Sequence, residues 1–161
     1  MTAEEYLELG HAYVQEKNWE PALNALLESQ KYFKELEEDA TPPLLLSLLG
    51  LSQAMARNNI EVGVSYCQRA IAEDSLQEDF YHHLGLVYLK AGDKKKAITV
   101  FKKGLRLSPN HSGIWSRIAQ LGLRKRPLLP FLPRQHFLNR FIGMWLAGPG
   151  EKPRTAARRI N

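Results

Sequence analysis

The side chains of this sequence that could carry chemistry are five histidines and a single cysteine. The histidines are His11, His82, His83, His111 and His136. A metal site needs several such ligands aimed at one point. Adjacent residues on a helix point about 100° apart, so His82 and His83 make a poor metal-binding pair. We therefore expect every histidine to be packed or solvated, and we predict no metal site.

No other group of residues has the composition of a catalytic centre. Cys67 is the only cysteine, which rules out a disulfide within the chain and a cysteine-rich metal site. The sequence also lacks a glycine-rich loop of the kind that binds phosphate. These features predict a protein that is not an enzyme, that needs no cofactor and that has no small-molecule substrate.

The charge of the chain is divided unevenly along its length. The 161 residues carry a net charge of +5, but residues 1–77 carry −8 and residues 78–161 carry +13. A basic end can meet an anionic partner. With equal weight, the two ends could attract each other, or the basic side chains could simply be solvated.

The sequence also contains indications of cellular location. It begins MTAEEYLELG, which lacks the basic start and the apolar run of a secretory signal. Its longest apolar cluster, residues 44–51, is far too short to cross a bilayer. We expect a cytoplasmic protein, with a peripheral location on a membrane as the alternative.

The elements that would position these residues form an internal repeat. The dipeptide Leu-Gly occurs at residues 9–10, 49–50 and 84–85, at intervals of 40 and 35 residues. The third copy has small and large residues at helical spacing: Tyr81, Leu84, Gly85, Tyr88, Ala97, Phe101, Gly104 and Pro109. The small residues let two helices approach closely, the large ones fill the space around them, and the proline ends the second helix.

In these residue types and spacings the third copy resembles the tetratricopeptide repeat, a helix–turn–helix unit of 34 residues. The resemblance implies an all-α fold, a right-handed superhelix (α-solenoid) of antiparallel helix pairs. It also implies a repeat domain at residues 1–124, with repeats at about 3–34, 43–77 and 78–111 and a capping helix at 112–124. Cys67 takes a large packing position of the second copy, so we expect an inert core residue.

The resemblance further implies where a partner binds, because in this family the first helices of successive repeats line a concave groove. By position, the groove would be lined by Leu7, His11, Val14, Ser47, Leu51, Met55, His82, Leu86, Leu89 and Lys90. Several of these residues could equally pack between helices. An apolar groove of this kind suits an amphipathic helix or an apolar peptide.

One subgroup of the family binds C-terminal carboxylates through a clamp of lysine, arginine and asparagine. The matching positions of this sequence carry none of these residue types: Leu7, His11, Asp79 and His83. We therefore do not expect a carboxylate clamp of that kind.

The repeat pattern ends at Arg124, and the composition of the sequence changes after it. Residues 125–147 combine a proline-rich strap with a segment in which apolar residues recur at helical spacing, and residues 148–161 have the composition of a disordered basic tail. The apolar residues of the C-terminal segment are Phe131, Phe137, Leu138, Phe141, Ile142 and Trp145. We predict a short amphipathic helix that packs on the repeats, with contact to a partner or to a membrane surface as open alternatives.

These patterns predict a non-enzymatic scaffold or adaptor that binds a helix or apolar peptide of a partner protein in its groove. Its own C-terminal segment would gate or complete that groove. The main alternative is a membrane-peripheral adaptor anchored by the basic, aromatic C-terminal helix. Nucleic-acid binding is weaker because the repeat half is acidic and has no known nucleic-acid motif. A secretion-type chaperone is weaker because the long leading helix of that group is missing.

Overall fold

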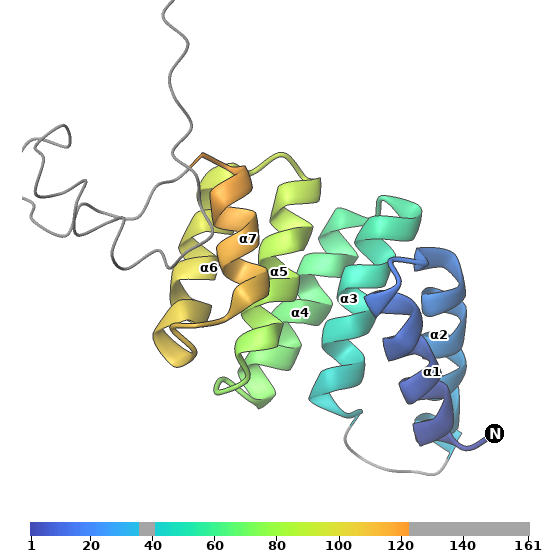
Figure 1. The fold of residues 1–161 in the computed structure, drawn as a ribbon. Helices are drawn as coiled ribbons and strands as arrows, with labels where there is room; N and C mark the ends of the chain where they lie inside the picture. The colour runs from blue at the N-terminus through green and yellow to red at the C-terminus, as the bar shows by residue number, and fades with distance from the viewer. Residues whose placement is uncertain (36–40, 123–161) are drawn as a thin grey trace, which may run out of the picture. The chain divides into compact units, whose positions relative to one another are not determined.

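The structure, a computed structural model, describes residues 1–35 and 41–122, and this part of the chain is entirely helical (Figure 1). Its helices are α1 (Ala3–Gln15), α2 (Trp19–Glu35), α3 (Pro43–Arg57), α4 (Ile60–Glu73), α5 (Glu78–Lys90), α6 (Lys94–Leu107) and α7 (Ser112–Gln120). The all-α class is therefore confirmed. No helix among the described residues is long and apolar enough to cross a lipid bilayer.

The helices pack in consecutive pairs. Helix α1 packs on α2, α3 on α4 and α5 on α6, while α7 packs against α6 after the third pair. The first helices α1, α3 and α5 also contact one another in succession, so they share one side of the stack. The fold is a helical solenoid, as the repeat pattern predicts.

Tight turns join the two helices of each pair. The backbone is left-handed at Lys17 (φ 60°), Asn58 (φ 56°) and Gly92 (φ 78°). Glycine adopts this conformation without steric cost, and asparagine tolerates it. After Gly92, the Asp93 carboxylate accepts a hydrogen bond at 2.9 Å from the amide of Lys96 and caps the start of α6.

Within each pair, a glycine of the first helix lies in close contact with a side chain of the second helix. The three contacts are Gly10 with Leu26, Gly50 with Cys67, and Gly85 with Phe101. A Cβ atom would lie 2.6 Å from Leu26 if built on Gly10 and 2.7 Å from Cys67 Sγ if built on Gly50; on Gly85 it would overlap the facing ring even more. The three glycines therefore set the distance between paired helices.

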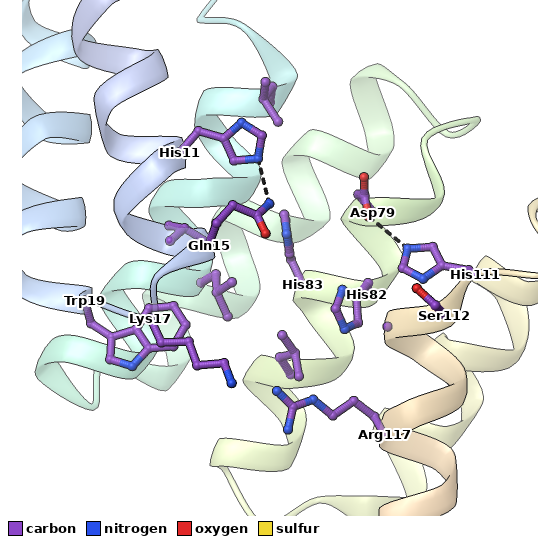
Figure 2. A pocket seen from close by; sticks show the side chains of 15 residues that line it. His11, Gln15, Lys17, Trp19, Asp79, His82, His83, His111, Ser112 and Arg117 are labelled. Atoms are coloured by element: carbon purple, nitrogen blue, oxygen red, sulfur yellow. Dashed lines mark hydrogen bonds and ion pairs between the residues drawn. The ribbon is translucent and has the colours of Figure 1, made fainter. Parts of the chain in front are cut away.

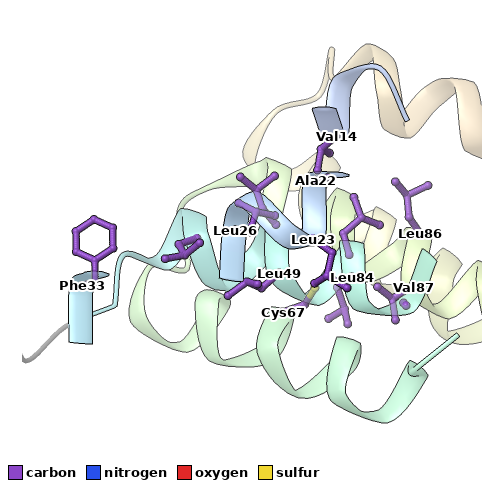
Figure 3. Packing of buried hydrophobic residues seen from close by; sticks show 14 of the residues in the cluster. Val14, Ala22, Leu23, Leu26, Phe33, Leu49, Cys67, Leu84, Leu86 and Val87 are labelled. Atoms are coloured by element: carbon purple, nitrogen blue, oxygen red, sulfur yellow. The ribbon is translucent and has the colours of Figure 1, made fainter. Parts of the chain in front are cut away.

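The main hydrophobic core extends through all three helix pairs, and Cys67 lies inside it (Figure 3). Its side chain is fully buried, and its thiol donates a hydrogen bond at 3.6 Å to the carbonyl of Ser47. Burial raises the pKa of this thiol to about 12. Only the thiolate is a strong nucleophile, so Cys67 is inert in the folded protein, as expected.

All seven helices belong to one compact unit, Met1–Leu123, and Arg124–Asn161 form a second unit. The second unit lies outside the described residues, so the strap, the amphipathic helix and the tail stay predictions. The same holds for the side chains singled out there: Phe131, Phe137, Leu138, Phe141, Ile142 and Trp145.

Candidate functional site

A cavity of about 300 Å³ lies where α1, α3, α5 and α7 face one another (Figure 2). Its lining comes from these four helices, from the α1–α2 turn, from the start of α2 and from the residue before α7. The lining residues are His11, Val14, Gln15, Lys17, Trp19, Leu44, Leu51, Asp79, His82, His83, Leu86, His111, Ser112, Gly113 and Arg117.

The floor of the cavity is apolar. Val14, Leu51 and Leu86 each belong to the main hydrophobic core and are at most 7% exposed. Each comes from a different first helix, α1, α3 and α5 respectively. A side chain that entered the cavity would therefore meet a fixed apolar surface, whose shape the packing of three helix pairs determines.

His83 forms a buried polar contact between two first helices. Its Nδ1 lies 2.8 Å from the hydroxyl of Ser47, which is itself fully buried on α3. Burial, reinforced by the charge of His82, lowers the pKa of His83 to about 3. His83 is therefore neutral at pH 7 and fixes the contact between α3 and α5.

His82 has a different environment, although it is the next residue. Its Nε2 atom is shielded from solvent and has no hydrogen-bond partner among the described residues. Burial, followed by the charge of His111, lowers the pKa of His82 to about 4. A neutral imidazole nitrogen without a partner is uncommon in a protein interior and leaves a hydrogen-bonding or coordinating position for a ligand.

Asp79 and His111 form a hydrogen bond with each other beside His82. The His111 Nε2 lies 2.8 Å from the Asp79 carboxylate, while its Nδ1 accepts a hydrogen bond at 3.2 Å from the amide of Ile114 and caps α7. Partial burial acts to raise the pKa of Asp79, but the hydrogen bond from His111 and the nearby histidines outweigh it and hold the pKa below its usual value. The Asp79 carboxylate is therefore ionised at pH 7.

These residues bring three metal-ligating groups together. One ligand atom each from Asp79, His82 and His111 lies within 4.8 Å of the other two. In the sequence, only His82 and His83 are adjacent. His111 is distant in the chain, so no spacing marks it as a partner, and it comes close only when α7 packs onto the third repeat.

Two cationic side chains complete the lining. Lys17 is exposed in the α1–α2 turn, and Arg117 lies on α7, where it donates a hydrogen bond at 3.1 Å to Gln120. Figure 2 shows both side chains extending toward the same part of the cavity from different elements. Since Asp79 is paired with His111, these cations leave the cavity with a positive character.

The structure brings about half of the predicted groove residues together. Those that line the cavity are His11, Val14, Leu51, His82 and Leu86. Those that do not are Leu7, Ser47, Met55, Leu89 and Lys90. Ser47 is buried against His83, Lys90 is exposed at the end of α5, and the other three are half-buried against the core.

Several lining residues were not predicted from the sequence, but one signal could have found Arg117. Trp115 corresponds to Tyr81 in the repeat pattern, and Arg117 follows Trp115 at the same interval as His83 follows Tyr81. The capping helix therefore contributes to the cavity as a fourth first helix. No comparable signal marks Lys17 or Trp19, which enter the cavity from a turn and from the start of α2.

Comparison with known proteins supports the repeat assignment. The family profile described as the tetratricopeptide repeat matches residues 78–111. A comparison with curated proteins gives no significant match. Among solved structures, a crystal structure of MamA is similar to this chain, with 28% identity, a TM-score of 0.54, and coverage of 76% of this chain and 70% of that one.

A second structure of MamA has 20% identity and a TM-score of 0.50 over 93% of this chain and 76% of that chain, which is a likeness of fold. The matched repeat coincides with α5 and α6, the helix pair that contributes Asp79, His82 and Leu86 to the cavity. Proteins of this kind are typically non-catalytic scaffolds. Residues 78–111 match the tetratricopeptide repeat, and the described part of the chain is an all-helical solenoid similar in fold to MamA, which supports a general role in protein interactions.

Proposed function

We propose that the cavity binds a peptide segment of a partner protein that carries an apolar side chain next to a carboxylate. The observation that carries this proposal is the composition of the lining. The buried apolar side chains of Val14, Leu51 and Leu86 and the cationic side chains of Lys17 and Arg117 line the same cavity.

The size of the cavity supports a peptide side chain as the occupant. About 300 Å³ is at the lower end of the range for small-molecule sites, and it accommodates one or two side chains. Partner recognition commonly depends on a few such anchors that enter a preformed pocket. Trp19 and Leu44, which also line the cavity, would add to the apolar contact.

The charge of the lining supports an acidic neighbour for that anchor. The Asp79 carboxylate is already paired with His111, whereas Lys17 is exposed and Arg117 has a neutral partner, Gln120. An arginine that binds a carboxylate forms a directional, charge-assisted hydrogen bond. This arrangement differs from the family's carboxylate clamp, because the cations here come from a turn and from the capping helix.

Selection of short random peptides displayed on phage tests the proposal directly. We expect enriched peptides to combine a large apolar residue with aspartate or glutamate. Arg117→Glu should weaken the binding of such a peptide at least about tenfold, which corresponds to about 1.4 kcal/mol. Fluorescence anisotropy with the labelled peptide measures this affinity.

Lys102→Glu is the matched control, because Lys102 is exposed on α6 and does not line the cavity. It makes the same change in net charge and should leave the affinity within about twofold, apart from a general electrostatic effect that salt removes. Equal losses for Arg117→Glu and Lys102→Glu at moderate salt would count against a specific role of the cavity.

We further propose that the C-terminal segment competes with a partner for this site. The proposal rests on the sequence, which joins an apolar amphipathic segment to a solenoid with an apolar pocket. A chain that ends at Arg126 should bind the selected peptide more tightly than the full chain. Equal affinity and equal thermal stability of the two chains would exclude this competition.

The membrane alternative makes a different prediction for the same segment. If it inserts into a bilayer, the full chain should float with anionic vesicles, and Phe141→Asp with Trp145→Asp should abolish flotation. No flotation at low salt would eliminate that alternative.

A further inference from the structure

We propose that Asp79, His82 and His111 form a binding site for a divalent transition-metal ion of the zinc class. The three residues come from two places in the chain. Asp79 and His82 are three residues apart on one face of α5, and His111 is the residue that precedes α7. Their ligand atoms lie within 4.8 Å of one another, a spread that one ion at ordinary zinc–ligand distances can span after small side-chain movements.

The unpartnered nitrogen of His82 is the second observation that supports a ligand at this place. Buried nitrogen atoms are normally hydrogen-bonded, yet the Nε2 atom of His82 has no partner among the described residues. A Cβ atom at Gly113 would lie 3.2 Å from this Nε2 and 3.1 Å from the His111 ring. The glycine therefore leaves space between the two imidazoles that any other residue would narrow.

The chemistry of the ligands suits a metal. An imidazole nitrogen offers a lone pair to a metal ion, and a carboxylate such as that of Asp79 supplies the negative charge that a cation requires. Lys17 and Arg117 line the same cavity, but neither has an ion pair with Asp79.

His111 must change its tautomer to join the site. At present its Nδ1 accepts from the amide of Ile114, so a neutral ring carries its proton on Nε2 and donates it to Asp79. For Nε2 to bind a metal, that proton has to move to Nδ1 through solvent, and the 3.2 Å hydrogen bond from Ile114 is lost. The Asp79–His111 contact thus marks the metal-free state, in which a proton lies between the two ligands.

The donor set selects the kind of ion. Two imidazole nitrogens and one carboxylate oxygen suit zinc, cobalt, nickel or copper, whereas calcium and magnesium prefer oxygen ligands throughout. All three residues line the cavity, so the remaining coordination positions face it and are open to water or to an incoming group. The site does not depend on the peptide-binding proposal and can be tested without a partner.

Calorimetric titration of zinc chloride into the full chain, after treatment with EDTA and dialysis, tests the proposal. We expect one zinc ion per chain, a rise in the melting temperature with zinc, and no response to calcium. Asp79→Asn, His82→Gln and His111→Asn should each weaken zinc binding more than about tenfold, since even the loss of an indirect partner of a metal ligand costs 10- to 100-fold. Asparagine at position 111 keeps an acceptor for the start of α7, which protects the fold.

His11→Gln is the matched control, because His11 lines the same cavity but lies outside the cluster. Its zinc affinity should stay within about twofold of the parent. Circular dichroism checks that each variant is folded. Because the three ligand positions are tested separately, the two remaining variants still test the proposal if one variant does not fold. No zinc binding by the parent chain, or unchanged binding in both histidine variants of the cluster, overturns the proposal.

Discussion

The contacts between paired helices and the polar side of the cavity are built in opposite ways. Within the pairs, Gly10, Gly50 and Gly85 occupy the same position of successive repeats, and each lies against the second helix of its pair. In the cavity, the polar side chains differ from one repeat to the next: Asp79 contacts His111 from outside its own repeat pair, and Lys17 lies in a turn. The comparison indicates that repeated positions determine packing, whereas departures from the repeat determine what the cavity can bind.

The largest difference in stability is expected between alanine substitutions at two glycines, one in a contact between paired helices and one in the cavity lining. Gly85→Ala should lower the free energy of unfolding by about 2–3 kcal/mol, because the new methyl group overlaps the ring of Phe101 inside a close-packed core. Gly113→Ala should change it by no more than about 1 kcal/mol, because the nearest atom is the movable end of the His82 side chain and alanine favours the helix. Urea denaturation measures both changes.

If Gly85→Ala and Gly113→Ala destabilised the protein equally, the predicted difference between packing positions and cavity positions would be wrong. A double variant, Gly85→Ala with Phe101→Leu, sharpens the test. It should recover part of the lost stability, because the smaller side chain makes room for the methyl group.

An intermediate effect is expected at two buried serines of α3. Ser47→Ala should cost about 1–3 kcal/mol, because it leaves the buried Nδ1 of His83 without a partner. Ser52→Ala should be neutral or slightly stabilising, because the Ser52 hydroxyl is buried and has no hydrogen-bond partner among the described residues. Both changes are read from the midpoint of urea unfolding at pH 7.5.

The two serines are a matched pair, since both are fully buried on the same helix. The comparison fails if Ser52→Ala is as costly as Ser47→Ala, because hydroxyl burial rather than the contact with His83 would then matter. A change in the slope of the unfolding free energy against urea concentration would instead indicate a change in the compactness of the native or denatured state.

The smallest effect on stability is expected at Arg117. Arg117→Glu should change the free energy of unfolding by no more than about 0.5 kcal/mol, because its hydrogen bond to Gln120 is a surface contact. The same change should abolish most of the affinity for a selected peptide, as proposed above. Thermal unfolding and peptide anisotropy on one sample separate these two readouts, and a large loss of stability would assign Arg117 to packing instead.

The pattern of residue types predicted most of the fold. Helical spacing of Tyr81, Leu84 and Tyr88 predicted the third pair, and the position of Cys67 in its repeat predicted a buried, inert thiol. These predictions succeeded because contacts within a repeat join residues close in sequence, so that local spacing determines them. The repeat pattern was less informative for the groove. Carrying positions from one repeat to the next assumes that every first helix turns the same face toward the groove.

Ser47 and His111 show what the spacing left open. Ser47 was expected to face the groove, but its hydroxyl lies in the interface between α3 and α5, bonded to His83. His111 was expected to be packed or solvated and is partly buried, but its contact with Asp79 at the start of α7 was not predicted. In each case the outcome depends on how two helices from different repeats are oriented, which spacing within one repeat does not determine.

The sequence by itself determined the helix pairs, the glycine contacts inside them and the buried cysteine, because these follow from residue types at fixed intervals. Only the tertiary structure decided the composition of the cavity. Its apolar floor comes from three helix pairs, its cations come from a turn and from the capping helix, and Asp79, His82 and His111 meet only once α7 has packed. Side chains so distant in sequence can bind one ligand together only when the stacked helices hold them close to one another.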